Sequence, residues 1–348
     1  MTRQNVDWLV AGPAADLRYL TGLVGHPSER MSVLLVPRGG GPIYLAPGLE
    51  APQLANRRDL LDVVTWEETQ DPATIAADLL GGDSPTVAVD DTLWSVFLLR
   101  LQEALPGAAW SEAGALLRPL RMIKDGREIE LMREAARRTD DAWLEFISAP
   151  IAGLTELQAL RRLLDLTYAR GLGPNFGSCG SGPNSASPHH SGNDRVIQPG
   201  DAVVFDWGGT LEGYNSDITR TVFVGEPPDD FRRAYAAVLA ANEAALQVIR
   251  PGVPCEALDL TARAVLEDAG YGEYILHRVG HGLGLSIHEE PYLVLGNTLP
   301  LAEGMIFSDE PGIYIPGRWG IRIEDAVLCT DTGAERLNEA PRELTVVG

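Results

Sequence analysis

Two strand-turn-strand segments, each carrying a pair of acidic residues, place the tightest limit on how this chain can fold. In the first segment, DAVVFDWGGTLEGYNSDITRTVFV, Asp206 and Asp217 are equidistant from a turn centre between Leu211 and Glu212. An antiparallel hairpin about that centre would place the two carboxylates opposite each other, with Cβ atoms about 4.5–5.5 Å apart. Like charges held so closely require a cation or a shared proton.

The second segment, EPGIYIPGRWGIRIED, repeats this arrangement near the C-terminus. Its turn contains Pro316 and Gly317, and Glu310 and Glu324 are equidistant from the glycine. We therefore predict a second facing pair of carboxylates, and two pseudo-symmetric halves that meet around the four acids. Four buried carboxylates would balance the charge of two divalent cations.

Histidines are concentrated between the two acidic segments. Three of the chain's six histidines, His277, His281 and His288, lie in the sequence HRVGHGLGLSIHEEP. Gly280 interrupts the first two, so they do not form the helical HExxH motif of a zinc protease. One histidine joined to four carboxylates makes a site dominated by oxygen, which favours a hard ion such as Mn²⁺. Zinc, cobalt and iron remain alternatives.

The chain changes character near residue 120. Before that point, short apolar runs alternate with turn residues and helix-like stretches, which is typical of a small α/β domain. A long amphipathic helix follows within residues 118–149. A capping-box pattern at Thr155 and Gln158 opens another helix. We predict an α/β domain over residues 1–119 and an α+β domain over residues 120–348, with helices covering antiparallel strands.

Charge and cysteine content limit the partners and the compartment. A net charge of -21 argues against binding to nucleic acid or to an anionic membrane, because both need clustered positive charge. No run approaches the ~18 apolar residues of a membrane span. The three cysteines are far apart and lack CxxC spacing, which argues against a disulfide framework. We therefore expect a soluble, cytoplasmic protein.

The acidic and histidine motifs resemble those of the pita-bread metallopeptidases, the group that contains methionine aminopeptidase, aminopeptidase P, prolidase and creatinase. The similar segments are DWG, GYNSDITRT, HGLGLSIH, EPGIYI and GIRIED, in that order along the chain. LRYLTG at 17–22 resembles the creatinase-type N-terminal domain. SGPNSASPHHSGNDR at 181–195 resembles the proline-specific branch. The resemblance implies a creatinase-type domain followed by a pita-bread catalytic domain with pseudo-two-fold halves.

The same resemblance implies five metal ligands and two divalent ions, most readily Mn²⁺, with Co²⁺ or Zn²⁺ as alternatives. Asp206 would bind one ion, and His281 and Glu310 would bind the other. Asp217 and Glu324 would bridge the two ions. Such ions lower the pKa of bound water and so supply a nucleophile at neutral pH.

Other site residues also follow from the resemblance. Glu310 would act as general base, while His288 and His189 would stabilise the oxyanion and position the substrate. Arg322 and His277 would support these groups. His190 has no assigned role.

The resemblance predicts an Xaa-Pro aminopeptidase, which acts on peptides with proline as the second residue. The alternative is a prolidase that cleaves Xaa-Pro dipeptides only, in which an arginine such as Arg318, or one from a partner subunit, captures the terminal carboxylate. Remoter alternatives are a creatinase-like hydrolase of a small molecule and an inactive scaffold. A homodimer is also implied.

Asp309 directly precedes Glu310 on the same predicted strand. Successive side chains of a strand point to opposite faces, so Asp309 should point away from Glu310 and have a structural partner.

Overall fold

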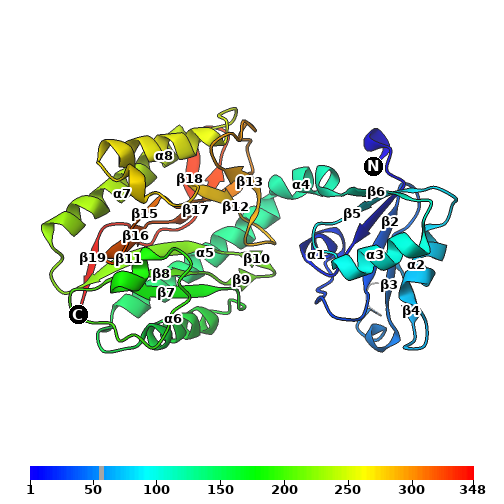
Figure 1. The fold of residues 1–348 in the computed structure, drawn as a ribbon, viewed down its shortest axis with the longest axis horizontal. Coiled ribbons are helices and arrows are strands. Elements are labelled where there is room, and N and C mark those ends of the chain that lie inside the picture. The colour runs from blue at the N-terminus through cyan, green and yellow to red at the C-terminus, as the bar shows by residue number, and fades with distance from the viewer. Residues whose placement is uncertain (55–58) are drawn as a thin grey trace. The chain divides into compact units, whose positions relative to one another are not determined.

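The fold consists of two compact units, shown in a computed structural model that describes residues 1–54 and 59–348 (Figure 1). The first unit is Met1–Arg121 and the second is Met122–Gly348. The boundary expected from the sequence, between residues 119 and 120, falls inside the helix that joins them, α4 (Gly114–Met122). None of the described helices is both long enough and apolar enough to cross a membrane.

The first unit is an α/β domain, as predicted. Its six-stranded sheet has the order β4-β3-β2-β1-β5-β6. The strands are β1 (Trp8–Ala11), β2 (Val33–Pro37), β3 (Ile43–Pro47), β4 (Asp62–Trp66), β5 (Thr86–Val89) and β6 (Ala109–Glu112). The helices are α1 (Ala15–Thr21), α2 (Pro72–Leu80) and α3 (Ser95–Ala104). Buried apolar residues of the strands pack against α2 and α3, so the sheet and these helices share one core.

Four helices belong to the second unit. They are α5 (Gly126–Ile147), α6 (Glu156–Ala169), α7 (Asp229–Val248) and α8 (Glu256–Asp268). The capping box predicted at Thr155 and Gln158 is present at the start of α6, and Asp125 and Glu128 form another at the start of α5. Each box satisfies backbone N–H groups that the first helical turn leaves unpaired.

Two sheets in the second unit carry the acidic segments. One has the order β19-β11-β8-β7 and the other β13-β12-β14-β17-β18. The first contains β7 (Gly177–Ser181), β8 (Ala202–Trp207), β11 (Ile218–Val224) and β19 (Thr345–Val347). The second contains β12 (Gly280–Gly282), β13 (Glu289–Leu293), β14 (Ile306–Asp309), β17 (Asp325–Cys329) and β18 (Ala334–Arg336). Two short hairpins extend them, β9 (Thr210–Leu211) with β10 (Tyr214–Asn215), and β15 (Gly312–Ile315) with β16 (Trp319–Arg322).

The register predicted for the first hairpin is wrong. Asp206 lies opposite Thr219, not opposite Asp217. The turn is centred between Glu212 and Gly213, whose φ angles are 47° and 87°, one residue later than expected. Two successive residues with positive φ form the type of turn that joins strands tightly. Asp217 therefore shares the face of Thr219, two residues away, and is a diagonal neighbour of Asp206.

The register predicted for the second hairpin is confirmed. Asp309 pairs with Asp325 and Gly312 with Arg322, so the residues between these pairs are matched about Gly317. Glu310 and Glu324 therefore occupy opposed positions. Gly317 has a φ of 72°, a conformation that glycine adopts without steric cost.

Two apolar clusters hold the hairpins in place. Behind the first hairpin, Phe205 and Trp207 of β8 pack on Trp143 and Phe146 of α5. Each buried aromatic side chain contributes about 2–3 kcal/mol relative to exposure. Behind the second hairpin, residues of α7 and α8 pack against β14 to β17, and Figure 1 shows these helices covering that sheet. Asp206 thus lies on a strand fixed by packing, and the other three acids directly adjoin the ends of such strands.

Candidate active site

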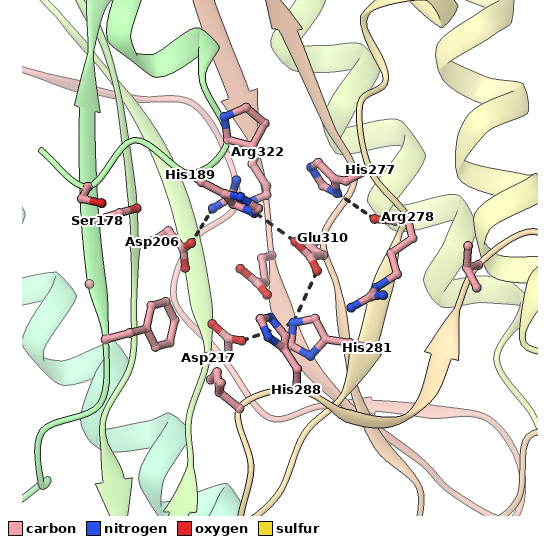
Figure 2. Close-up of a pocket in the computed structure, with 17 residues that line it drawn as sticks. Ser178, His189, Asp206, Asp217, His277, Arg278, His281, His288, Glu310 and Arg322 are labelled. Carbon is pink, nitrogen blue, oxygen red and sulfur yellow. Dashed lines mark hydrogen bonds and ion pairs between the residues drawn. The ribbon is translucent and has the colours of Figure 1, made fainter. Parts of the chain in front are cut away.

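One cavity of about 720 Å³ in the second unit contains the residues singled out by the sequence (Figure 2). Its lining includes all nine predicted ligands and supporting side chains: His189, Asp206, Asp217, His277, His281, His288, Glu310, Arg322 and Glu324. They come from strands of both sheets, from residues close to the ends of those strands, and from the loop before β8. The predicted meeting of two halves around one group of acids therefore matches the positions of these side chains.

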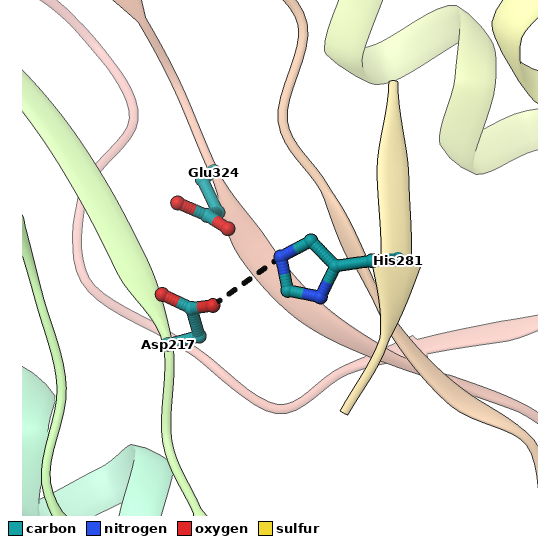
Figure 3. Close-up of side chains that lie close together, drawn as sticks. All are labelled: Asp217, His281 and Glu324. Carbon is teal, nitrogen blue, oxygen red and sulfur yellow. Dashed lines mark ion pairs between the residues drawn. The ribbon is translucent and has the colours of Figure 1, made fainter. Parts of the chain in front are cut away.

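Three side chains form the centre of this group (Figure 3). Asp217, His281 and Glu324 each offer one ligand atom, and the three atoms lie within 4.8 Å of one another. His281 Nε2 is 3.6 Å from Asp217 Oδ2. Asp217 Oδ1 is buried and has no hydrogen-bond partner among the described residues. A buried carboxylate oxygen without a donor is costly, so this atom requires a cation or a proton.

Asp206 and Glu310 complete the group of acids. Asp206 Oδ2 accepts a hydrogen bond of 2.6 Å from an Arg322 guanidinium nitrogen. Glu310 Oε1 is 3.5 Å from His281 Nε2 and accepts a 3.4 Å hydrogen bond from Ser308 Oγ. Asp206 and Glu310 are partly exposed to the cavity, whereas the other two acids are almost fully buried.

Burial changes the protonation of the whole group. It raises the pKa of Asp206, Asp217 and Glu324 above their ordinary values, and in the latter two the neighbouring carboxylates raise it further. Burial also raises the pKa of Glu310 to about 7, while the charge of Arg322 opposes the shift. All four acids can be ionised together only if further positive charge is supplied.

His281 is prepared to act as a neutral ligand. Burial, and then the charge of His288, lower its pKa to about 3. Its Nδ1 donates to the Gly282 carbonyl at 3.1 Å, which leaves Nε2 facing the acids. An imidazole fixed through one nitrogen and free at the other is the usual metal-binding arrangement. Together with four carboxylates and the unpaired Asp217 oxygen, it fits a pair of divalent cations.

Arg322 connects several parts of the site through its guanidinium. Besides Asp206, it donates to Thr219 Oγ1 at 2.9 Å and to the Tyr314 hydroxyl at 2.8 Å. It does not pair with Asp325, which binds Arg220 at 2.6 Å instead. The side chain is almost fully buried, so its three hydrogen bonds fix its position.

His277 is linked to the acids through Tyr314 and Arg322. Its Nδ1 donates to the Arg278 carbonyl at 2.7 Å, and its Nε2 lies 2.8 Å from the Tyr314 hydroxyl. Burial and then Arg322 lower its pKa to about 4, so the ring is neutral at ordinary pH. Nε2 then accepts from Tyr314, whose oxygen accepts from Arg322.

Thr219 is a site residue that the sequence analysis missed. Its hydroxyl donates to Glu324 Oε2 and accepts from Arg322 Nε, and its carbonyl accepts from the Glu324 backbone N–H at 3.1 Å. Thr219 thereby joins the first hairpin to the second. The correct turn centre would have identified it, because it is the residue opposite Asp206. Tyr314 was also missed, and only its position in the EPGIYI segment could have suggested it.

His288 and His189 both line the cavity, and each keeps part of its surface open to solvent. The His288 ring packs edge-on against His281, with 4.1 Å between ring centroids. Burial, and then the charge of Arg278, lower the pKa of His288. Both imidazoles can therefore present a ring nitrogen to a bound molecule.

The loop that carries His189 is anchored by a buried acid. Glu156 is fully buried at the start of α6 and accepts hydrogen bonds from Ser181, Asn184 and Asn193. His190, which the sequence left without a role, lies 2.7 Å from the same carboxylate. His190 thus holds the loop, while its neighbour faces the cavity.

Two other expectations from the sequence are not supported. Arg318 is not part of the cavity lining; it pairs with Asp230 at 2.5 Å and lies over the Trp319 ring. Asp309 is buried away from the cavity, as expected, but neither of its carboxylate oxygens has a hydrogen-bond partner among the described residues. Burial, and then the facing Asp325, raise its pKa.

Comparisons with known proteins add evidence from outside the chain. The chain matches metallopeptidase family M24 over residues 130–331 and the creatinase/prolidase N-terminal domain over residues 1–123. A "Probable dipeptidase PepE" of Mycobacterium tuberculosis is 42% identical over 344 residues, or 97% of this chain and 92% of that protein. An Xaa-Pro dipeptidase of Lactobacillus helveticus is 34% identical, over 95% of this chain and 92% of its own length. The crystal structure of a prolidase from Thermococcus sibiricus has a TM-score of 0.95 and 34% identity, covering 99% of this chain and 96% of that one.

Proposed function

This chain belongs to metallopeptidase family M24, and from that premise we propose that it is an Xaa-Pro dipeptidase, which hydrolyses dipeptides with proline as the second residue. The matches confirm the expected fold class, a creatinase-type domain followed by a pita-bread catalytic domain. The dipeptidase was the alternative drawn from the sequence. Similarity to proteins named dipeptidase, over nearly their whole lengths, supports it better than the aminopeptidase first expected.

One observation carries the proposal: the five side chains predicted to bind metal line one cavity of a chain that is similar to dipeptidases along its length. We assign two divalent cations to Asp206, Asp217, His281, Glu310 and Glu324. Four carboxylates and one imidazole favour Mn²⁺ over softer ions. When bound, such cations polarise the scissile carbonyl and lower the pKa of water.

The side chains of the protein account for the proton movements. Glu310 faces the cavity beside His281, and its carboxylate takes a proton from the attacking water. The remaining hydroxyl group bonds to the carbonyl carbon, and the proton passes to the proline nitrogen as the C–N bond breaks. His288 and His189 stabilise the carbonyl oxygen by hydrogen bonding. The products are a free amino acid and free proline.

The cavity also has features that suit a proline ring. An Xaa-Pro bond is a tertiary amide without an N–H, so the enzyme gains nothing from a hydrogen-bond acceptor there. Phe176, Ile287 and Val294 provide apolar lining beside the acids. Packing of the ring against such side chains replaces the missing hydrogen bond as the source of binding energy.

Hydrolysis of matched peptides tests the proposal. The enzyme is stripped of metal, reloaded with Mn²⁺ and assayed with Ala-Pro and Ala-Pro-Ala. We expect metal-dependent cleavage of Ala-Pro and much slower cleavage of the tripeptide. Preferred cleavage of Ala-Pro-Ala would restore the aminopeptidase assignment, and no metal-dependent cleavage of either peptide would reject both.

A further inference from the structure

Arg278 is a cationic residue of the cavity with no assigned role. It lies two residues before β12, is partly buried, and lines the cavity together with His277 and His288. Its guanidinium carbon lies 4.2 Å from the centroid of the Tyr292 ring on β13. Among the described residues, no hydrogen bond or ion pair is made by its side chain. A cation in a cavity without an acidic partner is available to an anionic ligand.

The other arginine of the cavity cannot serve this purpose. Arg322 is almost fully buried, and its guanidinium is used by Asp206, Thr219 and Tyr314. Removing it from these partners would leave buried polar groups unpaired, which is costly. Arg278 differs because only the face of its guanidinium is in contact, with an aromatic ring. Stacking leaves the N–H groups at the edge free to donate.

Arg278 also lies close to the expected reaction centre. Figure 2 shows its side chain extending into the cavity on the side of Glu310 and His281. After the effect of burial, its charge contributes to the lowered pKa values of His288 and His281, and it also opposes the rise in the pKa of Glu310. Its backbone is held in place, because its carbonyl accepts a hydrogen bond from His277 Nδ1.

We propose that Arg278 binds the C-terminal carboxylate of the dipeptide substrate and so makes the site selective for dipeptides, an inference that rests on the proposed function. In Xaa-Pro, the terminal carboxylate is only one residue beyond the scissile carbonyl, and successive Cα atoms are about 3.8 Å apart. The carboxylate must therefore lie within the same cavity. A guanidinium matches a carboxylate with two parallel N–H···O bonds.

This arrangement explains how one residue discriminates between peptide lengths. A tripeptide presents a neutral amide where a dipeptide presents a carboxylate. The amide cannot form the charge-assisted pair, and its chain must continue past Arg278. The guanidinium is then left in the cavity without a counter-charge, so binding of the longer peptide is weakened.

The test compares Ala-Pro with its amide, Ala-Pro-NH₂, which differs only in the charge of the terminal group. Full-length, Mn²⁺-loaded enzyme is assayed as wild type, Arg278→Met and Arg278→Lys. For Arg278→Met we expect kcat/KM on Ala-Pro to fall by roughly 30-fold, mainly through KM, with a change of less than about threefold on the amide. Arg278→Lys should keep part of the preference, because it retains the charge but not the fork.

Arg318→Met is the matched control, since it removes an arginine of the same unit that does not line the cavity. It should leave kcat/KM on both substrates unchanged. Thermal unfolding of each variant separates a binding defect from misfolding. If Arg278→Met lowered kcat/KM equally on Ala-Pro and on the amide, or on neither, the role of Arg278 would be overturned. The proposed dipeptidase function would not be affected by that result. Wild type that cleaves neither substrate, or prefers the amide, would overturn both proposals.

Discussion

The two acid-bearing hairpins of the second unit face the same cavity but rest on different supports. Behind β8 and β11, Phe205 and Trp207 pack on the aromatic residues of α5. Behind β14 and β17, Asp309 faces Asp325, which is paired with Arg220 from the other sheet. The acidic pattern repeats in the sequence because both hairpins turn the same side, the one that carries the acids, towards the cavity. It does not reveal that the second hairpin, besides its apolar packing on α7 and α8, also has a buried pair of acids behind it.

The largest expected effect tests whether the hairpins are equivalent on the cavity side. Asp217→Asn removes an acid of the first hairpin and Glu324→Gln one of the second. Because both acids belong to one proposed metal site, each variant should lose at least about 1,000-fold in kcat/KM, beyond the 10–100-fold typical of supporting residues. Metal content is measured by mass spectrometry.

Glu212→Gln is the control for these two variants, since Glu212 lies at the turn of the first hairpin and pairs with the exposed Arg127. It should retain full activity. If only one of the two acids were needed, the idea of a site shared equally by both hairpins would be wrong.

A second comparison tests the buried acids behind the second hairpin. Asp325→Asn removes the partner of the buried Arg220 and should lower the free energy of unfolding by about 3 kcal/mol, because an uncompensated charge stays buried. Asp309→Asn should cost close to nothing, since Asp309 has no hydrogen-bond partner to lose among the described residues. Urea denaturation measures both. A larger loss for Asp309→Asn would contradict this interpretation.

A third comparison tests the junction between the hairpins. Thr219→Val keeps the shape but removes the hydroxyl between Glu324 and Arg322, so kcat/KM should fall roughly 10–100-fold. Thr221→Val is the matched control, because among the described residues the Thr221 hydroxyl binds only the backbone of Arg322. Its activity should stay within a few-fold of wild type. Equal activity losses in the two variants would indicate a purely structural role for Thr219.

The smallest expected effect is a change in stability with pH. It involves hydrogen bonds that connect α5 to the second hairpin. Asp140 accepts hydrogen bonds from Asn338 and Glu339, and Asn338 in turn binds the backbone of β17. Burial raises the pKa of Asp140 from 3.8 to about 6. The folded state then holds a proton that the unfolded state has lost, so the stability due to Asp140 declines as pH rises from about 4 to 6.

Asp140→Asn cannot titrate and should lack this decline. The stability of wild type relative to the variant should fall by about 2 kcal/mol between pH 4 and pH 7. Urea denaturation at several pH values measures the difference. A constant difference across that range would show that Asp140 does not titrate in this way.

Much of this architecture could be predicted from the sequence. Apolar runs and capping residues predicted both domain classes, and glycine at the second turn predicted the register of Glu310 with Glu324. The residues predicted for the metal site lie together in one cavity, although their roles as ligands stay predictions. These successes depend on local signals, such as turn residues and short motifs.

The failures come from signals that are not local. The first turn was centred by the symmetry of its acids, yet the structure centres it one residue later, where Glu212 and Gly213 both have positive φ angles. Thr219 binds Glu324, which lies 105 positions further along the chain. No sequence motif predicts such a contact. The same holds for Arg278 on Tyr292, because only the folded sheet brings β12 beside β13.

The most direct test of the shared site is the anomalous scattering of Mn²⁺ in crystals of the metal-loaded enzyme. We predict two anomalous peaks among Asp206, Asp217, His281, Glu310 and Glu324, with side chains of both hairpins contacting the metal. No peak in the cavity, or peaks contacted by the acids of one hairpin alone, would contradict it.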